Sequence, residues 1–391
     1  MKLLTLTSLS LALLFSGCGS GSSGSESTSV TKADLGKRLF FDANLSLNKS
    51  MSCSTCHNPD TAFIDARFQE PSHGNPVDGA LSLGDDGLSL GGRNAPSVAY
   101  AMFSPTFGQN SDGDYVGGQF HDGRSQDLKA QAKGPFLDAA EMMMPDDASV
   151  IERVKENPQY VADITALYGD ILDDVNASYH AITEAIATFE KDEETFATFD
   201  SKYDKYLKKE YSMSIQEELG YSLFFSNNNT NCATCHTLNS ESEASERELF
   251  SNYEYENIGT PPNMANFIAK GIAYSPDLGL GGRDDINDSA HYGKYKVPTL
   301  RNVAVTGPYM TNGVFKNLRT VIEFYDHLAG NSDHPINPET GEAWEEPKVP
   351  ETVNHEVLQD TKALTDDKID AIVAFLKLLT DERYEHLIAE D

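Results

Sequence analysis

Cysteine, tryptophan and long apolar runs are scarce in this chain of 391 residues, and basic charge is scarce relative to acidic charge. The sequence has five cysteines and one tryptophan, and its 30 basic residues stand against 61 acidic ones, which gives a formal net charge of −31. No stretch has the length and apolarity of a membrane-spanning helix. The acidic excess disfavours nucleic acid as a partner, because phosphate would be repelled. The acidic excess would either attract a basic protein partner or simply contribute to solubility.

Four of the five cysteines lie in two pentapeptides of identical spacing, residues 53–57 (CSTCH) and residues 232–236 (CATCH). Cys-x-x-Cys-His is the attachment site of a c-type haem. The two thiols form thioethers with the vinyl groups of one porphyrin, and the adjacent histidine supplies the proximal iron ligand. Two Cys-x-x-Cys pairs could instead hold a structural zinc, but a histidine after both pairs favours haem. The predicted haem c residues are Cys53, Cys56 and His57 at the first site and Cys232, Cys235 and His236 at the second.

The N-terminus has the pattern of an export signal. A basic start is followed by an apolar stretch from Leu3 to Phe15, which is too short to cross a membrane. Residues 15–18 (FSGC) resemble a bacterial lipoprotein cleavage box. We therefore expect residues 1–18 to be a lipoprotein signal peptide with Cys18 as the lipidated residue. A plain secretory signal that removes Cys18 is the alternative.

The residues after this signal indicate a tether and a location. Residues 19–32 are rich in Ser and Gly, so they are expected to form a flexible linker between the lipid and the fold. With four cysteines used by haem and one by lipid, none is left for a disulfide. The expected location is the periplasmic side of a bacterial membrane, contacted only through the lipid anchor. By resemblance to sorted lipoproteins, Gly19 rather than Asp after the lipidated cysteine favours the outer membrane.

An internal repeat precedes the two haem motifs. Residues 35–41 (LGKRLFF) stand before the first motif and residues 219–225 (LGYSLFF) before the second. This period is too long for a solenoid and indicates a duplicated haem domain. We expect a mainly α fold with long irregular loops, built of two cytochrome c-like haem domains that are related by the repeat and span residues 33–205 and 206–391.

Two helices are predicted from their apolar periodicity. One carries a buried stripe with the spacing i, i+3, i+4 and i+7, formed by Ile182, Ala185, Ile186 and Phe189. The other begins after Thr365 as N-cap, has acidic residues in its first turn, and buries Ile369, Ile372, Val373 and Leu376. Both stripes are interpreted as core.

Three further stretches, taken together with the haem motifs, are specific enough to indicate a protein family. They are residues 92–97 (GRNAPS), residues 120–141, which contain FHDGR and end in Glu141, and residues 296–309, which contain KVPTLRNV and end in GPY. With the two haem motifs in this order, the chain from about Asp34 to Leu379 resembles the bacterial di-haem cytochrome c peroxidases and their MauG-like relatives. The resemblance implies an oxidoreductase in which peroxide reacts at the N-terminal haem and the C-terminal haem handles electrons.

The resemblance also implies roles around the first haem. Glu141 matches the distal acid, Gln131 a neighbouring distal amide, and Pro135 a residue over the distal face. Cleavage of the peroxide O–O bond needs a group that takes a proton from one oxygen and delivers one to the other; a solvated loop glutamate is the alternative for Glu141. Expected partners of the haem propionates are Arg93, Arg124 and Arg301, although each could be an ordinary surface charge. His73 matches a histidine that caps this haem at rest in some members; an exposed loop histidine is the alternative.

Around the second haem the resemblance implies a sixth ligand and an ion. Tyr325 matches the position of the distal ligand, and a tyrosine there is typical of MauG-like proteins. Met310 or Met264 as the sixth ligand, or an open site, are the alternatives. A phenolate would lower the potential of the iron and a thioether would raise it. A calcium site between the haems is implied for Asn94 with the carbonyls of Thr306 and Pro308, because Ca²⁺ prefers oxygen ligands.

Two positions depart from the family pattern. His121 stands where the family usually has an inter-haem tryptophan, and Thr311 replaces a histidine found in many relatives. A tryptophan relay between the irons is therefore in doubt, and His121 either carries a proton-coupled version of it or fills space.

The expected function is a di-haem peroxidase that reduces H2O2 to water at the first haem. Electrons would enter through the second haem from a small cytochrome c or cupredoxin. The first alternative is a MauG-like, peroxide-dependent oxidase that modifies residues of a partner protein. The second is a non-catalytic di-haem electron-transfer protein, against which Glu141 and Gln131 argue, because a pure carrier has no use for a distal acid.

Overall fold

The computed structural model describes residues 29–68, 79–238, 247–330, 332–359 and 361–389. The predicted signal peptide, Cys18, most of the predicted tether and His73 lie outside the described residues, so those predictions are not tested by the structure. Among the described residues, no helix is both long and apolar enough to cross a membrane.

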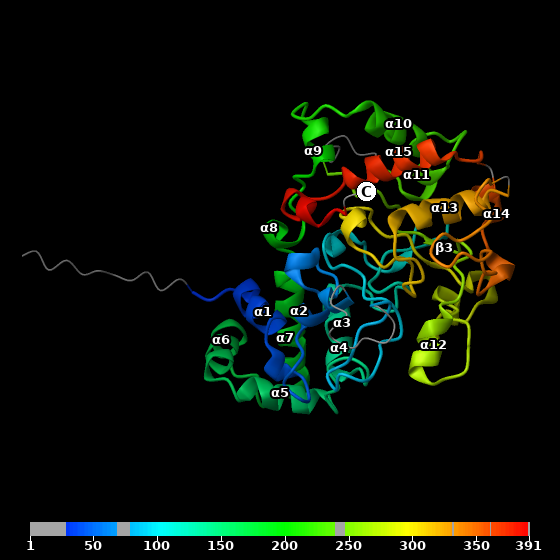
Figure 1. Cartoon of the computed structure of the whole chain (residues 1–391). Coiled ribbons are helices and arrows are strands. Elements are labelled where there is room, and N and C mark those ends of the chain that lie inside the picture. The colour runs from blue at the N-terminus through cyan, green and yellow to red at the C-terminus, as the bar shows by residue number, and fades with distance from the viewer. Residues whose placement is uncertain (1–28, 69–78, 239–246, 331, 360, 390–391) are drawn as a thin grey trace, which may run out of the picture.

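Helices dominate the fold (Figure 1). The helices of the N-terminal half are α1 (Lys32–Phe40), α2 (Cys53–Cys56), α3 (Leu128–Gln131), α4 (Gly134–Leu137), α5 (Asp147–Lys155), α6 (Pro158–Tyr168), α7 (Val175–Phe189), α8 (Glu193–Phe196) and α9 (Lys202–Leu207). Those of the C-terminal half are α10 (Ile215–Phe224), α11 (Cys232–Cys235), α12 (Met264–Lys270), α13 (Leu318–Leu328), α14 (His355–Gln359) and α15 (Asp366–Lys377). The mainly α class is as predicted.

The strands among the described residues are only two residues long. β1 (Gly108–Gln109) pairs antiparallel with β2 (Tyr115–Val116), and β3 (Tyr255–Glu256) pairs antiparallel with β4 (Tyr295–Lys296). Single 3-10 turns link many of the helices, among them η5 (Ala101–Phe103) and η8 (Val303–Val305).

The N-terminal core is built where α1 crosses α7. The predicted stripe on α7 is buried, from Ile182 to Phe189, against Leu35 and Phe40 of α1. Gly36 permits the close approach, because a Cβ there would lie 1.9 Å from the carbonyl oxygen of Ala185. Burial of these apolar faces is the main stabilising term for short helices of this kind.

The C-terminal core repeats this arrangement with α10 and α15, which run along the top of Figure 1. Thr365 is the N-cap residue of α15, Asp366 and Asp367 form its acidic first turn, and the predicted apolar stripe is buried. Gly220 of α10 lies against the carbonyl of Ala371, as Gly36 does against that of Ala185. Cys53 and Cys56 pack against the N-terminal core, and Cys232 packs against the C-terminal core.

Candidate functional site

A cavity of about 550 Å³ lies beside the first haem motif. Its volume is in the range of pockets that bind cofactors and other small molecules. The predicted site residues that line it are Cys53, Cys56, His57, Arg93, Asn94, Arg124, Gln131, Pro135 and Glu141. The fold therefore brings the attachment motif and the predicted distal residues to one cavity, although up to 88 residues separate them.

The two motif histidines are oriented in the same way. His57 Nδ1 donates to the carbonyl of Phe63 at 3.2 Å, and His236 Nδ1 donates to that of Phe250 at 2.8 Å. Both phenylalanines are fully buried and have a left-handed backbone, with φ of 59° and 55°. Burial lowers the pKa of both histidines, which favours the neutral imidazole. With Nδ1 engaged, each ring offers Nε2 to a metal, as ligating histidines usually do.

Glu141 lies in a tight turn that follows α4. Its N–H donates to the Asp138 carbonyl, and its own carbonyl accepts from the N–H of Asp85. Burial, with a smaller contribution from the negative charge of Asp138, raises the pKa of Glu141 to about 7, while Arg124 opposes the shift. A carboxyl group with a pKa near 7 can both accept and donate a proton at neutral pH. Gln131 ends α3 and Pro135 lies in the first turn of α4, and both also line the cavity.

Arg93 and Arg124 line this cavity and share a carboxylate. Arg93 forms two hydrogen bonds with Asp277, at 2.7 and 2.8 Å, and an ion pair with Asp122 at 2.6 Å. Arg124 pairs with the other oxygen of Asp122 at 3.0 Å, and its guanidinium lies 3.5 Å from the centre of the Phe120 ring. Their roles as propionate partners stay predictions.

Arg301 has a different environment from the one expected. Its side chain is fully buried and forms a two-pronged ion pair with Asp204, at 2.7 and 2.8 Å. Its Nε donates to the carbonyl of Glu248 at 2.6 Å, and Nη1 also contacts Ser201. Because carboxylate and carbonyl oxygens already hold this guanidinium, its placement gives no support to a propionate contact.

Tyr325 of α13 is the predicted distal residue of the second haem motif. Burial raises the pKa of the Tyr325 phenol, and the charges of Cys235 and Cys232 contribute to the shift, so the phenol lies near the two thiols. Its neighbours in the apolar cluster of α13 include Phe324 and Trp344. This placement is compatible with the predicted distal role.

The methionine alternatives lie in unequal positions. Met310 packs in the same cluster as Tyr325. Met264 is 41% exposed on α12, a helix whose Asn266 and Phe267 line the first cavity. Met310 is therefore the better placed of the two relative to the second motif.

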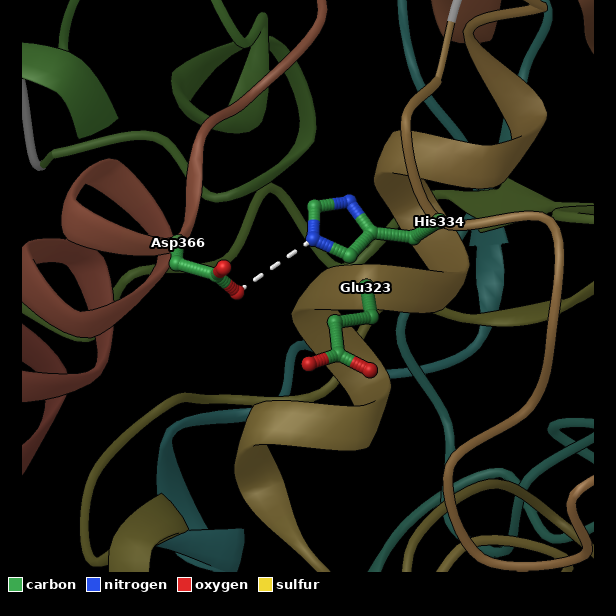
Figure 2. Close-up of side chains that lie close together, drawn as sticks. All are labelled: Glu323, His334 and Asp366. Carbon is green, nitrogen blue, oxygen red and sulfur yellow. Dashed lines mark ion pairs between the residues drawn. The ribbon is translucent and has the colours of Figure 1, made fainter.

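A charged group ties α13 to α15 next to Tyr325. Figure 2 shows Glu323 of α13, Asp366 of α15 and His334, whose Nε2 lies 3.5 Å from Asp366. Arg319 pairs with Glu323 at 2.8 Å and also with Asp366. The guanidinium of Arg319 therefore already bridges these carboxylates. The resulting charged cluster stabilises the position of α13, the helix that carries Tyr325.

A second, small cavity of about 10 Å³, close to the space of one water molecule, is lined by Asn94 and Pro308 of the predicted calcium site. Asp65 and Ser82 also line it, whereas Thr306 is not among its lining residues. The Asn94 side-chain nitrogen donates to the carbonyl of Ala80 at 3.2 Å, which leaves its amide oxygen available to a cation. The residue types suit a hard ion.

His121 is half-buried at the wall of the first cavity. Its Nε2 donates to the carbonyl of Asn94 at 3.0 Å, and its own carbonyl accepts from the N–H of Lys296. Burial and the charge of Arg93 lower its pKa to about 4, so the ring is neutral at pH 7. Trp344 is buried, and its indole N–H donates to the carbonyl of His334.

Sequence reasoning missed two acidic residues of the first cavity. Asp277 binds Arg93 across 184 positions, and nothing in its local sequence marks it. Glu190 is 4% exposed, lines the cavity, and has an oxygen with no hydrogen-bond partner within the described part of the chain. An acidic residue directly after the buried stripe of α7 was the available signal for it.

The four free thiols of the two motifs, two oriented imidazoles and a cofactor-sized cavity define the class of protein as a di-haem c-type cytochrome. Residues 30–212 match the family model described as di-haem cytochrome c peroxidase. The chain is 45% identical to the methylamine utilization protein MauG of Paracoccus denitrificans (strain Pd 1222), over 92% of this chain and 90% of that protein. It is 31% identical to cytochrome c peroxidase Ccp of Escherichia coli (strain K12), over 73% of this chain and 51% of the other.

A solved structure agrees with these relatives. A variant of the diheme peroxidase BthA from Burkholderia thailandensis E264 superposes with a TM-score of 0.80 at 29% identity, covering 92% of this chain and 88% of the other. The chain belongs to the di-haem cytochrome c peroxidase and MauG family. It is therefore an oxidoreductase with two c-type haems, and the residues of both motifs fit these groups.

Proposed function

We propose that the chain reduces H2O2 to water at the haem on His57, with Glu141 as acid and base. The observation that carries this is a carboxyl group with a pKa of about 7 in the same cavity as the attachment motif. When bound, the haem supplies the iron that binds and reduces peroxide. Glu141 accepts the proton of one peroxide oxygen and delivers it to the other, Gln131 orients the substrate, and Pro135 restricts water.

Electrons enter, in this proposal, through the haem on His236, with Tyr325 as its distal residue. The donor is a small redox protein, a cytochrome c or a cupredoxin. The net charge of −31 supports a basic donor, because opposite charge speeds the encounter at low salt. Anchoring by a lipid on Cys18 at the periplasmic side of a bacterial membrane belongs to the same proposal.

The two haem domains, residues 33–205 and 206–391, are proposed to be related by duplication. Two pairs of positions support this: Gly36 and Gly220 each lie against a helix carbonyl, and Phe63 and Phe250 each orient a motif histidine. A calcium ion held by Asn94 with the carbonyls of Pro308 and Thr306 is proposed at the small cavity between the halves, where Asn94 and Pro308 are lining residues.

A second candidate is a MauG-like oxidase that uses peroxide to modify residues of a partner protein. The 45% identity to a MauG protein and the tyrosine at position 325 favour it. The absence of a tryptophan at position 121 weakens it.

One stopped-flow experiment separates these candidates. The diferric protein is mixed with H2O2, with and without a reduced small cytochrome c. Rapid, repeated oxidation of the donor supports the peroxidase, whereas a long-lived oxidised state with slow donor turnover supports the MauG-like oxidase. No change in haem absorbance would contradict both and leave a pure electron-transfer role.

A further inference from the structure

Tyr100 lies at the seam between the two halves of the molecule. It is fully buried, and its neighbours Val98 and Ala101 line the first cavity. Its ring packs against Phe199, with ring centres 5.0 Å apart, and lies 5.6 Å from the guanidinium of Arg301. The phenol is therefore enclosed by residues from both halves of the chain.

The phenol has a fixed carboxylate as its hydrogen-bond acceptor. Tyr100 donates to Asp381 Oδ1 at 2.5 Å, and its oxygen accepts from the N–H of Phe199 at 3.2 Å. Asn302 donates to the other oxygen of Asp381 at 2.9 Å and accepts from its N–H at 2.8 Å. Asp381 and Asn302 are both fully buried. A proton that leaves Tyr100 thus has one defined destination, which does not require bulk water.

On the N-terminal side, short contacts lead from Tyr100 to the first haem histidine. The N–H of Tyr100 donates to the carbonyl of Phe196 at 2.9 Å, and the Phe196 ring stacks on Phe63 with centres 4.6 Å apart. The carbonyl of Phe63 is the acceptor for His57 Nδ1.

On the C-terminal side, the connection runs through Arg301. Its guanidinium lies 5.6 Å from the Tyr100 ring and 5.8 Å from the Phe250 ring. The carbonyl of Phe250 is the acceptor for His236 Nδ1. Tyr100 is thus connected to both motif histidines on the side of their Nδ1 atoms.

We propose that Tyr100 is a redox-active tyrosine that serves both haem sites; this rests on the proposed reaction with peroxide. Tyr100 gives one electron to a haem site that peroxide has oxidised, and its phenolic proton passes to Asp381. The products are a neutral phenoxyl radical and a carboxylic acid, and the haem site is reduced by one equivalent. One electron from the donor, with the proton returned from Asp381, restores the phenol.

The proton acceptor is the decisive part of this step. Removing an electron alone would leave a positive charge on a buried ring, which is costly in a medium of low polarity. Transfer of the proton to Asp381 Oδ1, which lies 2.5 Å from the phenol oxygen, keeps the ring neutral. The guanidinium of Arg301 lies beside the ring, and the carboxylate of Asp204 neutralises its charge.

The test is freeze-quench EPR of the haem-loaded protein after mixing with H2O2. Wild type is expected to give a tyrosyl radical signal that appears at least twofold more slowly in D2O. Tyr100→Phe removes the signal, and Asp381→Asn, which keeps the phenol but not the acceptor, reduces it at least tenfold. Either variant alone is decisive if the other does not fold, as judged by haem content and circular dichroism.

Two matched variants serve as controls. Tyr160 is 3% exposed and donates to Asp42 at 2.8 Å, so it has the same type of partner away from the seam. Tyr179 is 5% exposed and donates to the carbonyl of Lys133 at 2.6 Å. Tyr160→Phe and Tyr179→Phe are expected to retain the full signal.

The outcomes separate this inference from the proposed function. If peroxide changes the haem absorbance but Tyr100→Phe keeps the wild-type signal, the inference is wrong and the peroxide reaction stands. If peroxide leaves the haems unchanged, the proposed function fails. A photogenerated ruthenium(III) complex then serves as the one-electron oxidant, and a radical that survives Tyr100→Phe again overturns the inference.

Discussion

Gly220 of α10 lies so close to Ala371 of α15 that a Cβ on the glycine would sit 1.8 Å from the alanine carbonyl oxygen. Replacing it must push the two helices apart, and overpacking of this kind costs about 1–3 kcal/mol. We predict that Gly220→Ala lowers the thermal unfolding temperature of the haem-loaded protein, measured by circular dichroism. Gly108→Ala is the control, because its nearest neighbour would be 3.9 Å away. Equal melting of the two variants would contradict the prediction.

Glu141→Gln is expected to slow the reaction of the N-terminal haem with peroxide about 10²- to 10⁴-fold, the usual contribution of an acid–base group. Because the pKa of Glu141 is raised to about 7, the wild-type rate should rise with pH through about 7, as the carboxylate that accepts the peroxide proton forms. The variant should lack this rise. Asp138→Asn removes a negative neighbour and should move the midpoint to lower pH. Stopped-flow absorbance across pH measures all three; a pH-independent wild-type rate would argue against the assignment.

Tyr325→Met is expected to raise the reduction potential of the C-terminal haem by on the order of 0.1 V or more, because axial ligands span about 0.8 V. Spectroelectrochemical titration measures this directly. Tyr309→Phe is the matched control, since Tyr309 belongs to the same cluster and donates to the carbonyl of Val303. A potential that shifts in Met310→Leu and not in Tyr325→Met would assign the ligand to Met310 instead.

Asp277→Asn should destabilise the contact between the halves, with a loss of about 1.5–3 kcal/mol for hydrogen bonds to a charged group. Burial alone would raise the pKa of Asp277, but the hydrogen bonds and charge of Arg93 outweigh it and hold the pKa well below its usual range. The wild-type pair is therefore fully stabilising above about pH 4, the usual carboxyl pKa, and is lost as the pH falls below it.

Thermal unfolding of the wild type and of Asp277→Asn at pH 7 and at about pH 3 tests this. The difference between the two proteins should shrink at the lower pH. Asp285→Asn, which breaks a surface pair with Arg283, should change little, because Asp285 is 64% exposed. A pH-independent difference for Asp277→Asn would show that the charge of Asp277 is not what stabilises the contact.

Metal analysis of the purified protein is expected to find one calcium per chain, removable by a chelator. Asn94→Ala should reduce the calcium content, and Asn94→Asp, which keeps an oxygen at that position, should retain it. Chelation should also lower the unfolding temperature, because an ion that binds only the folded state stabilises it. Full calcium content in Asn94→Ala would remove this residue from the site.

Local patterns were enough for the haem residues and for the main helices. Attachment to haem depends on neighbouring residues such as Cys232, Cys235 and His236, and helix burial depends on a repeat of a few residues, as in α7 and α15. Both kinds of information are contained within one or two turns of chain. The order of the motifs along the chain was likewise enough to indicate the family.

Only the tertiary structure decided which distant groups meet. It paired Arg301 with the carboxylate of Asp204 and Arg93 with that of Asp277. It also brought the phenol of Tyr100 within hydrogen-bond distance of Asp381. Each of these partners lies about 100 positions or more away, and no periodicity links positions so far apart. The sequence by itself determined what is attached at each site. The packing of the two halves decided which charged groups, proton acceptors and contacts surround each site.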